Sequence, residues 1–166
     1  MRDFAADLRS AVDRAVPPLV ALGEARSRQH PAPGKWSPRE VIGHLVDSAS
    51  NNHQRFVRAQ LQDDLVFPGY DQAAWVRLQR YDESPWEELV ALWAGFNRHI
   101  ARVMDAVPDE MLTRPRARHN LHELAWAPVP SHQPATLDYF MRDYVAHLRH
   151  HLRQVLDVND HRWLAG

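Results

Sequence analysis

Four stretches of this chain space their apolar residues three and four positions apart, and none alternates convincingly with the period of two that is typical of strands. Spacing of three and four keeps side chains on one face of an α-helix. The four stretches cover approximately residues 4–22, 37–61, 84–107 and 136–156. Four amphipathic helices of this length bury their apolar faces most simply against one another. The sequence therefore predicts an all-α fold, a four-helix bundle.

Caps and prolines mark the ends of the expected helices. Residues 37–40 combine a serine cap, a proline at the first helical position and a glutamate at the third, which predicts a capping box. Residues 84–87 repeat this start signal for the third helix. Pro17 and Pro18 interrupt the first helix, where an internal proline costs about 3 kcal/mol. We expect that helix to kink at the proline pair, or to end there and restart.

Two long connections separate the expected helices, at residues 62–83 and 109–135. Loops longer than about 12 to 15 residues are uncommon in compact domains and are often functional. The aromatic residues inside them, among them Tyr70, Trp75 and Trp126, favour loops that pack against the bundle and contain short helices. A chain of 166 residues is most simply one domain, so we predict a single four-helix-bundle domain over residues 1–166.

Composition argues against several classes of function. The formal net charge is −1 and no basic patch or recognition-helix motif is present, which argues against binding of nucleic acid. No segment approaches the roughly 20 apolar residues of a membrane span, and the first residues lack the continuous apolar core of a signal peptide. The absence of cysteine excludes disulfides and a cysteine nucleophile. We expect a soluble, cytoplasmic protein.

Histidines on two of the expected helices are candidate metal ligands. His147 and His151 are four residues apart and therefore lie one above the other on the same helix face. On the second helix, His44 aligns with Asn51 and Arg55 on a polar stripe that borders the apolar face. Both polar stripes have the position expected of a pocket between helices, although each could equally face water. Spacing alone leaves these two interpretations open.

Three motifs in a fixed order resemble the DinB/YfiT-like superfamily of small bacterial proteins. They are KWSPREVIGHLVDSASNNHQRF, PGYDQAAWVRLQRYDE and DYVAHLRHHLRQV, which together span about residues 35–157. The resemblance implies a four-helix bundle, commonly dimeric, that holds a divalent metal ion through three histidines. By position, the ligands would be His44, His147 and His151, whereas His150 would not be a ligand. Nickel or zinc is the ion most expected, with iron or manganese as alternatives.

The resemblance implies less about the reaction than about the metal. Relatives of this kind are described as metal-dependent hydrolases, and some branches transfer groups with a low-molecular-weight thiol such as bacillithiol or mycothiol. An ion with an open position activates water or stabilises a thiolate. We therefore favour an enzyme that acts on a small molecule, as a hydrolase or a thiol S-transferase. The alternative is a non-catalytic metal-binding or stress-response bundle.

Other polar residues of these motifs are expected to support the site. Carboxylates near the histidines are predicted to accept hydrogen bonds from the free N–H groups of the imidazoles, and further polar side chains to bind the substrate. The carboxylate candidates are Asp47, Asp71 and Asp143, and the substrate-binding candidates are Asn51, Arg55, Tyr70 and Tyr144. No residue is singled out as a general base. A fourth ligand from His119 or His122 would instead indicate a closed, structural site.

Overall fold

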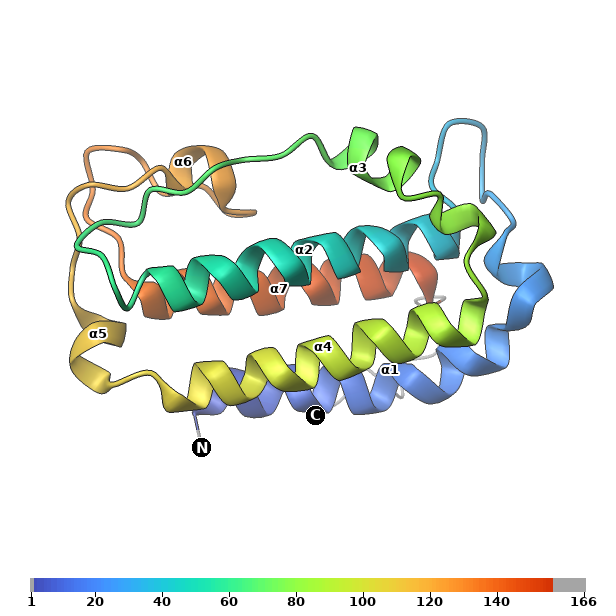
Figure 1. The fold of residues 1–166 in the computed structure, drawn as a ribbon, viewed down its shortest axis with the longest axis horizontal. Helices are drawn as coiled ribbons and strands as arrows, with labels where there is room; N and C mark the ends of the chain where they lie inside the picture. Colours follow the sequence, from blue (N-terminus) through green and yellow to red (C-terminus); the bar gives the residue numbers. More distant parts are fainter. Residues whose placement is uncertain (1, 157–166) are drawn as a thin grey trace.

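Four long helices form the body of the protein (Figure 1). A computed structural model describes residues 2–156. The elements are, in chain order, α1 (Asp3–Ser27), α2 (Pro38–Arg58), α3 (Gln72–Leu78), the 3₁₀-helix η1 (Tyr81–Glu83), α4 (Trp86–Ala106), α5 (Asp109–Thr113), α6 (Leu121–Leu124) and α7 (Leu137–Val155). Helices α1, α2, α4 and α7 form the bundle, and residues 2–156 contain no strand beyond isolated bridges. The predicted all-α four-helix bundle is therefore confirmed.

The first helix departs from the prediction at its break. The backbone stays helical through Pro17 and Pro18 and leaves the helical region only at Gly23, where φ is 73° and ψ is 172°. A positive φ is accessible to glycine at no steric cost, because glycine has no Cβ. The helical backbone is therefore interrupted at Gly23, and the helix does not end and restart at the proline pair.

The second helix begins as predicted. The Ser37 hydroxyl accepts a hydrogen bond from the Glu40 amide at 3.3 Å, and the Glu40 carboxylate accepts one from the Ser37 amide at 2.8 Å. These are the reciprocal bonds of a capping box, and they satisfy amides that have no partner inside the helix. Helix α2 ends at Arg58, earlier than the expected residue 61. Arg116 closes this end by donating to the Ala59 carbonyl at 3.0 Å.

Helix α4 is capped by a residue from another helix. Pro85 occupies the cap position and makes no side-chain cap hydrogen bond, so the capping box expected at residues 84–87 does not form. The Trp86 amide instead donates to the Glu24 carboxylate of α1 at 2.7 Å. Glu24 also pairs with the buried Arg39 of α2. One carboxylate thus joins the adjacent ends of three helices, a contact that local sequence patterns do not reveal.

A single hydrophobic core lies between the four helices. The predicted apolar stripe of α7 is buried as expected and consists of Leu137, Met141, Val145, Leu148, Leu152 and Leu156. Trp86 and Trp93 are fully buried, which places the indole of Trp93 in the core. No helix in the described part of the chain is both long and apolar enough to cross a membrane.

The two long connections pack over α2 and α7 and contain the short helices α3, α5 and α6 (Figure 1). They are tied to each other by backbone hydrogen bonds. Leu65 donates to the Arg118 carbonyl at 3.0 Å and accepts from the Asn120 amide at 3.1 Å. The Asn120 side chain bonds both backbone groups of Phe67, at 3.1 and 2.9 Å. As predicted, the loops are packed and ordered around short helices, and they cover the helix pair that carries the candidate site.

Candidate metal centre

Three histidines from two helices meet at one end of the bundle. The Nε2 atom of His147 lies 3.5 Å from that of His44 and 3.0 Å from that of His151. One nitrogen of each residue lies within 4.8 Å of one nitrogen of each of the others. His147 and His151 share a face of α7 because they are one helical turn apart, and the packing of α2 against α7 adds His44.

The spacing of these nitrogens fits one divalent ion. A ligand nitrogen lies 2.0–2.1 Å from zinc, so two nitrogens in a tetrahedral arrangement are about 3.3 Å apart. Two of the three separations, 3.0 and 3.5 Å, bracket this value, and all three lie within 4.8 Å. No other His, Asp or Glu in residues 2–156 joins the cluster. A site of three protein nitrogens leaves a coordination position for water or substrate.

Burial keeps these imidazoles neutral, which is the form that binds metal. His44 is fully buried. Burial lowers the pKa of His44 to about 4, with a smaller contribution from His151. It lowers the pKa of His147 to about 3, with contributions from His151 and His44. The pKa of His151 is also lowered by burial. At neutral pH the lone pairs of all three rings are therefore available.

The Nδ1 atoms of His151 and His44 have different environments. The Nδ1 atom of His151 lies 2.8 Å from the Gln154 amide oxygen, which selects the tautomer whose Nε2 is free to bind an ion. The Nδ1 atom of His44 is buried without a hydrogen-bond partner. The Trp36 ring packs beside His44, with 5.2 Å between ring centroids. Gln154 was not predicted as an orienting residue, although it shares the helix face of His147 and His151.

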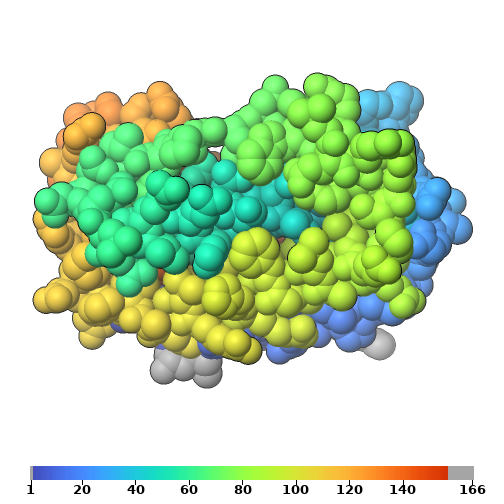
Figure 2. Space-filling model, in the orientation of Figure 1, coloured from blue at the N-terminus to red at the C-terminus, as the bar shows by residue number. Residues whose placement is uncertain are grey.

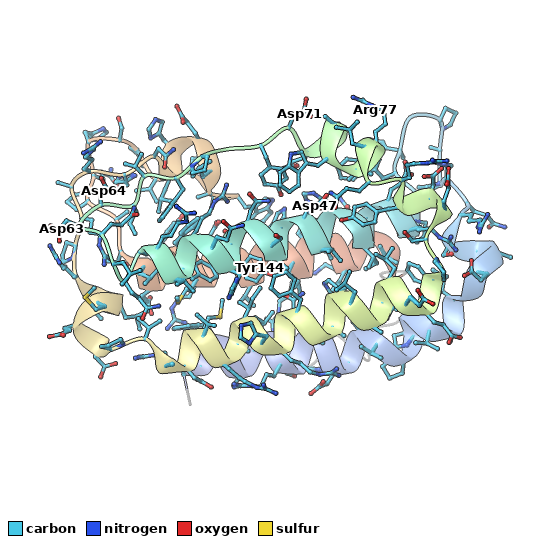
Figure 3. The ribbon with its side chains drawn as sticks, viewed as in Figure 1. Asp47, Asp63, Asp64, Asp71, Arg77 and Tyr144 are labelled. Atoms are coloured by element: carbon cyan, nitrogen blue, oxygen red, sulfur yellow. The ribbon has the colours of Figure 1, made fainter. Side chains whose placement is uncertain are left out.

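Asp47 does not bond to a histidine of the cluster. Its carboxylate accepts hydrogen bonds from the Tyr81 hydroxyl at 2.7 Å and from the Gln79 amide at 2.6 Å. Its other oxygen is buried without a partner. Burial is the main cause of the raised pKa of Asp47. In Figure 3, Asp47 lies between α2 and the α3–η1 segment, where it joins that segment to the helix that carries His44.

The other two candidate carboxylates also bind elsewhere. Asp71 caps α3 by accepting from the Ala74 amide at 2.9 Å, at the outer edge of the molecule (Figure 3). Asp143 accepts from the amides of Trp126 and Ala127 at 2.9 and 2.8 Å. Asp143 therefore holds the second long loop against α7. The hydrogen bonds of the structure thus do not support the expectation that these three aspartates orient the imidazoles.

A polar cavity of about 350 Å³ adjoins the histidines. It lies between α2, α7 and the covering loops, and Figure 2 shows the surface hollowed beneath the segment that crosses α2. Its polar lining consists of Ser48, Asn52, Arg55, Tyr70, Gln72, Glu123, Asp143, His147, His150 and His151. This volume is within the range of small-molecule sites. The cavity brings two of the three histidines together with two of the predicted substrate-binding residues, Arg55 and Tyr70.

The remaining substrate-binding candidates lie outside this cavity. The Asn51 amide donates to the backbone carbonyl of Asp47 at 2.9 Å, and the neighbouring Asn52 lines the cavity instead. Tyr144 is buried in the core and donates a hydrogen bond to Asn97 of α4, so it lies between the helices in Figure 3. A helical wheel places such residues only to within a face, and neighbouring helices determine which of them lines a cavity.

His119 and His122 do not complete the cluster. Both ring nitrogens of His119 are engaged, with the Gln133 carbonyl at 2.7 Å and the Leu121 amide at 3.2 Å. His122 is exposed near Glu123. Within residues 2–156 the site therefore lacks the fourth protein ligand that a closed structural site would have.

A second, wider groove of about 840 Å³ lies on the other side of His151. The loop before α2 and the end of α7 line it, and Trp36 and Gln154 are among its residues. It contains only one of the three histidines. The polar cavity is therefore the better candidate for the substrate site.

The fold and the cluster define a class: a helical bundle with three histidines that converge between two of its helices, beside a polar cavity. The sequence profile of the DinB superfamily matches residues 7–155. The chain therefore belongs to the DinB superfamily.

A solved structure and several sequence relatives support this family assignment. The structure of YfiT from Bacillus subtilis, described as an unusual four-helix bundle, superimposes with a TM-score of 0.75 at 18% identity, covering 96% of this chain and 85% of YfiT. In sequence, YfiT is 22% identical over 76% of this chain and 65% of its own length. A protein of Oceanobacillus iheyensis, OB0413, is 28% identical over 48% of this chain and 45% of its own length.

A second Oceanobacillus iheyensis protein, OB0782, is 31% identical over 47% of this chain and 45% of its own length. All three relatives are provisionally named metal-dependent hydrolases. The matched regions span about half of the two Oceanobacillus proteins and about two thirds of YfiT.

Proposed function

We propose that this protein is a metal-dependent hydrolase of a small molecule, and that His44, His147 and His151 hold its divalent ion. The observation that carries the proposal is the convergence of three neutral imidazoles beside a polar cavity: the Nε2 atom of His147 lies 3.0 Å from that of His151 and 3.5 Å from that of His44, and one nitrogen of each lies within 4.8 Å of the others. The names of the relatives support a metal-dependent hydrolase.

Residues of this chain have distinct parts in the proposed site. Gln154 holds the His151 ring so that its Nε2 faces the other two histidines. The loop held by Asp143 covers the cavity and limits the access of bulk water to a bound substrate. A divalent ion there would supply Lewis-acid chemistry to a polar bond of the substrate. Arg55 and Tyr70 would position the substrate from the cavity lining.

Three nitrogen donors suit nickel and zinc, and also accept iron or manganese, so we propose nickel or zinc as the native ion. A thiol S-transferase that uses bacillithiol or mycothiol is the second candidate. The chain contains no cysteine, so any thiolate in that reaction would come from the co-substrate. The homodimer and the cytoplasmic location stay predictions from the family resemblance and the composition.

Metal analysis tests the site directly. Protein purified without chelators or a histidine tag is analysed by inductively coupled plasma mass spectrometry, beside His44→Ala and His53→Ala. His53 is the matched control, because it lies on the same helix but contacts Phe96 and His99. We expect one divalent ion per chain in the wild type and the control, and none in His44→Ala. Absence of metal after divalent ions are added back, or retention in His44→Ala, would refute the site.

Assays with and without thiols separate the two reactions. The metal-loaded protein is screened against ester, amide and phosphoester substrates, first alone and then with low-molecular-weight thiols. Turnover without thiol supports the hydrolase. Turnover that requires the thiol and yields a thioether supports the transferase. A loaded protein that is inactive under all these conditions favours the non-catalytic bundle.

A further inference from the structure

Arg55 is a buried cation that lines the polar cavity. Its side chain is 6% exposed, and it extends from the last turns of α2. One guanidinium nitrogen donates to the Pro68 carbonyl at 2.9 Å, and another lies 3.4 Å from the Asn52 amide oxygen. Both acceptors are neutral. These bonds hold the guanidinium at the cavity without neutralising its charge.

No carboxylate among residues 2–156 forms an ion pair with Arg55. The two carboxylates that line the same cavity are engaged elsewhere. Both oxygens of Asp143 accept backbone amides, and Glu123 is exposed beside His122. A buried charge without a counter-ion is unfavourable, and such charges are normally paired. The charge on Arg55 is therefore uncompensated in the protein alone.

Two other arginines, Arg39 and Arg116, are buried at junctions of the fold. Arg39 pairs with Glu24 and donates to the carbonyl groups of Asp82 and Ser84, at the junction of three helix ends. Arg116 donates to the Ala59 carbonyl at the end of α2. Neither lines the polar cavity. Arg55 differs from both, because it is the one that faces a space that a ligand can enter.

Tyr70 adds a hydrogen-bond donor to the same cavity. Its ring packs on Trp75, with 4.8 Å between ring centroids, and it lines the cavity together with Arg55. Burial raises the pKa of Tyr70 to about 12, so the phenol stays protonated at neutral pH. A protonated phenol beside a guanidinium can donate to an anionic group that the guanidinium binds.

We infer that the substrate carries an oxyanion, a carboxylate or a phosphate, that Arg55 binds inside the polar cavity. The inference rests on the proposed function, because it places the reacting bond at the histidines. The backbone of Arg55 lies eleven residues beyond His44 on α2, about 16 Å along the helix axis, and its guanidinium reaches back as far as Asn52. The anionic group thus lies toward one end of the cavity and the reacting bond toward the other. The substrate class is an elongated small molecule with an anionic end.

The planar guanidinium of arginine can donate two parallel hydrogen bonds to one oxyanion. The ammonium group of lysine cannot form this pair of parallel bonds. This difference provides variants that separate charge from geometry. Arg55→Met removes the charge and keeps a long apolar side chain, and Arg55→Lys keeps the charge without the fork. Arg58→Met is the matched control, because Arg58 is exposed one turn further along α2 and does not line the cavity.

The test measures the binding of three probes to metal-free protein by isothermal titration calorimetry. Benzoate and phenyl phosphate carry the two oxyanions, and benzamide is the neutral control. We expect at least one oxyanion to bind at millimolar concentrations or below, and benzamide to bind more weakly than that anion. We expect the anion's affinity to fall at least tenfold in Arg55→Met, to fall less in Arg55→Lys and to stay unchanged in Arg58→Met. The anion that binds identifies which of the two oxyanions is recognised.

Equal binding of benzamide and the anions, unchanged affinity in Arg55→Met, or no binding of either anion would overturn the inference. The melting temperature provides a second readout. We expect Arg55→Met to melt at or above the wild-type temperature, because it removes an uncompensated buried charge, whereas Arg39→Met should melt lower. A lower melting temperature for Arg55→Met would assign the residue a structural role.

Metal content distinguishes this inference from the proposed function. If metal is bound and no anion binds, the oxyanion inference fails alone. If an anion binds through Arg55 and no metal is found, the hydrolase proposal fails and the anion site stands.

Discussion

Replacing Gly43 with alanine tests how closely the loops pack on the helix that carries His44. A Cβ at position 43 would lie 2.2 and 2.3 Å from two ring carbons of Tyr81 and 2.9 Å from the Tyr81 Cβ. These distances are far below ordinary contact, so the Tyr81 ring must move. Its hydroxyl donates to the Asp47 carboxylate at 2.7 Å, and a displaced ring loses that bond. The substitution should therefore destabilise the protein.

Opposing effects set the expected size of this change. Overpacking costs about 1 to 3 kcal/mol, and loss of a hydrogen bond to a charged group costs about 1.5 to 3 kcal/mol. Alanine in place of glycine favours a helix interior by about 1 kcal/mol. We expect Gly43→Ala to lower the free energy of unfolding by about 2 to 4 kcal/mol, because the two losses outweigh the gain.

Urea denaturation followed by circular dichroism measures this change, and Gly95 provides the matched control. Gly95 lies inside α4, and a Cβ there meets nothing within 4 Å. Gly95→Ala should therefore stabilise the protein by about 1 kcal/mol, since only the helix propensity changes. In a Tyr81→Ala background, Gly43→Ala should become neutral or stabilising. If Gly43→Ala stabilises the otherwise wild-type protein as much as Gly95→Ala does, the packing argument is wrong.

Three further predictions concern buried ionisable side chains. Arg39→Met should lower the free energy of unfolding by about 2 kcal/mol in urea denaturation, because charge-assisted bonds to Glu24 and to backbone carbonyls are lost; an unchanged value would contradict the junction of helix ends. For metal-free protein, burial lowers the pKa of His147 to about 3, while the unfolded chain titrates near the ordinary value of about 6.5. The unfolded state therefore takes up protons first, so the free energy of unfolding should fall as pH falls below about 6.5, and less steeply in His147→Leu. Asp143→Asn should speed hydrogen exchange at the Trp126 amide, because an amide side chain offers one acceptor oxygen in place of two; exchange at the wild-type rate would contradict this role of Asp143.

The local features of the fold were predictable from the order of residues. Apolar spacing predicted the four long helices, and the serine, proline and glutamate at residues 37–40 predicted the capping box that forms. The pair His147 and His151 follows from helical spacing, since residues four apart share a face. The family resemblance added His44, and the structure brings it next to them. The helices, the capping box and the histidine pair depend on residues close together in the chain. His44 was predicted because the motif around it resembles that of a known family.

Contacts between residues far apart in the chain were not predictable in this way. The cap of α4 comes from Glu24, and Gly43 is required because a tyrosine from another segment packs on it. Only the folded chain shows that Asp143 binds a loop and not an imidazole.

The protonation states of the buried residues were not predictable from the sequence either. The ordinary histidine pKa alone predicts loss of metal as pH falls through about 6.5 and below. Burial lowers the pKa of His44 to about 4, so we expect the proposed metal to be lost only at more acidic pH. The sequence by itself indicated the four long helices and, through helical spacing, the candidate metal ligands His147 and His151. Burial and pairing, which arise only when distant segments pack together, determine the protonation of those residues and leave Arg55 without a counter-ion.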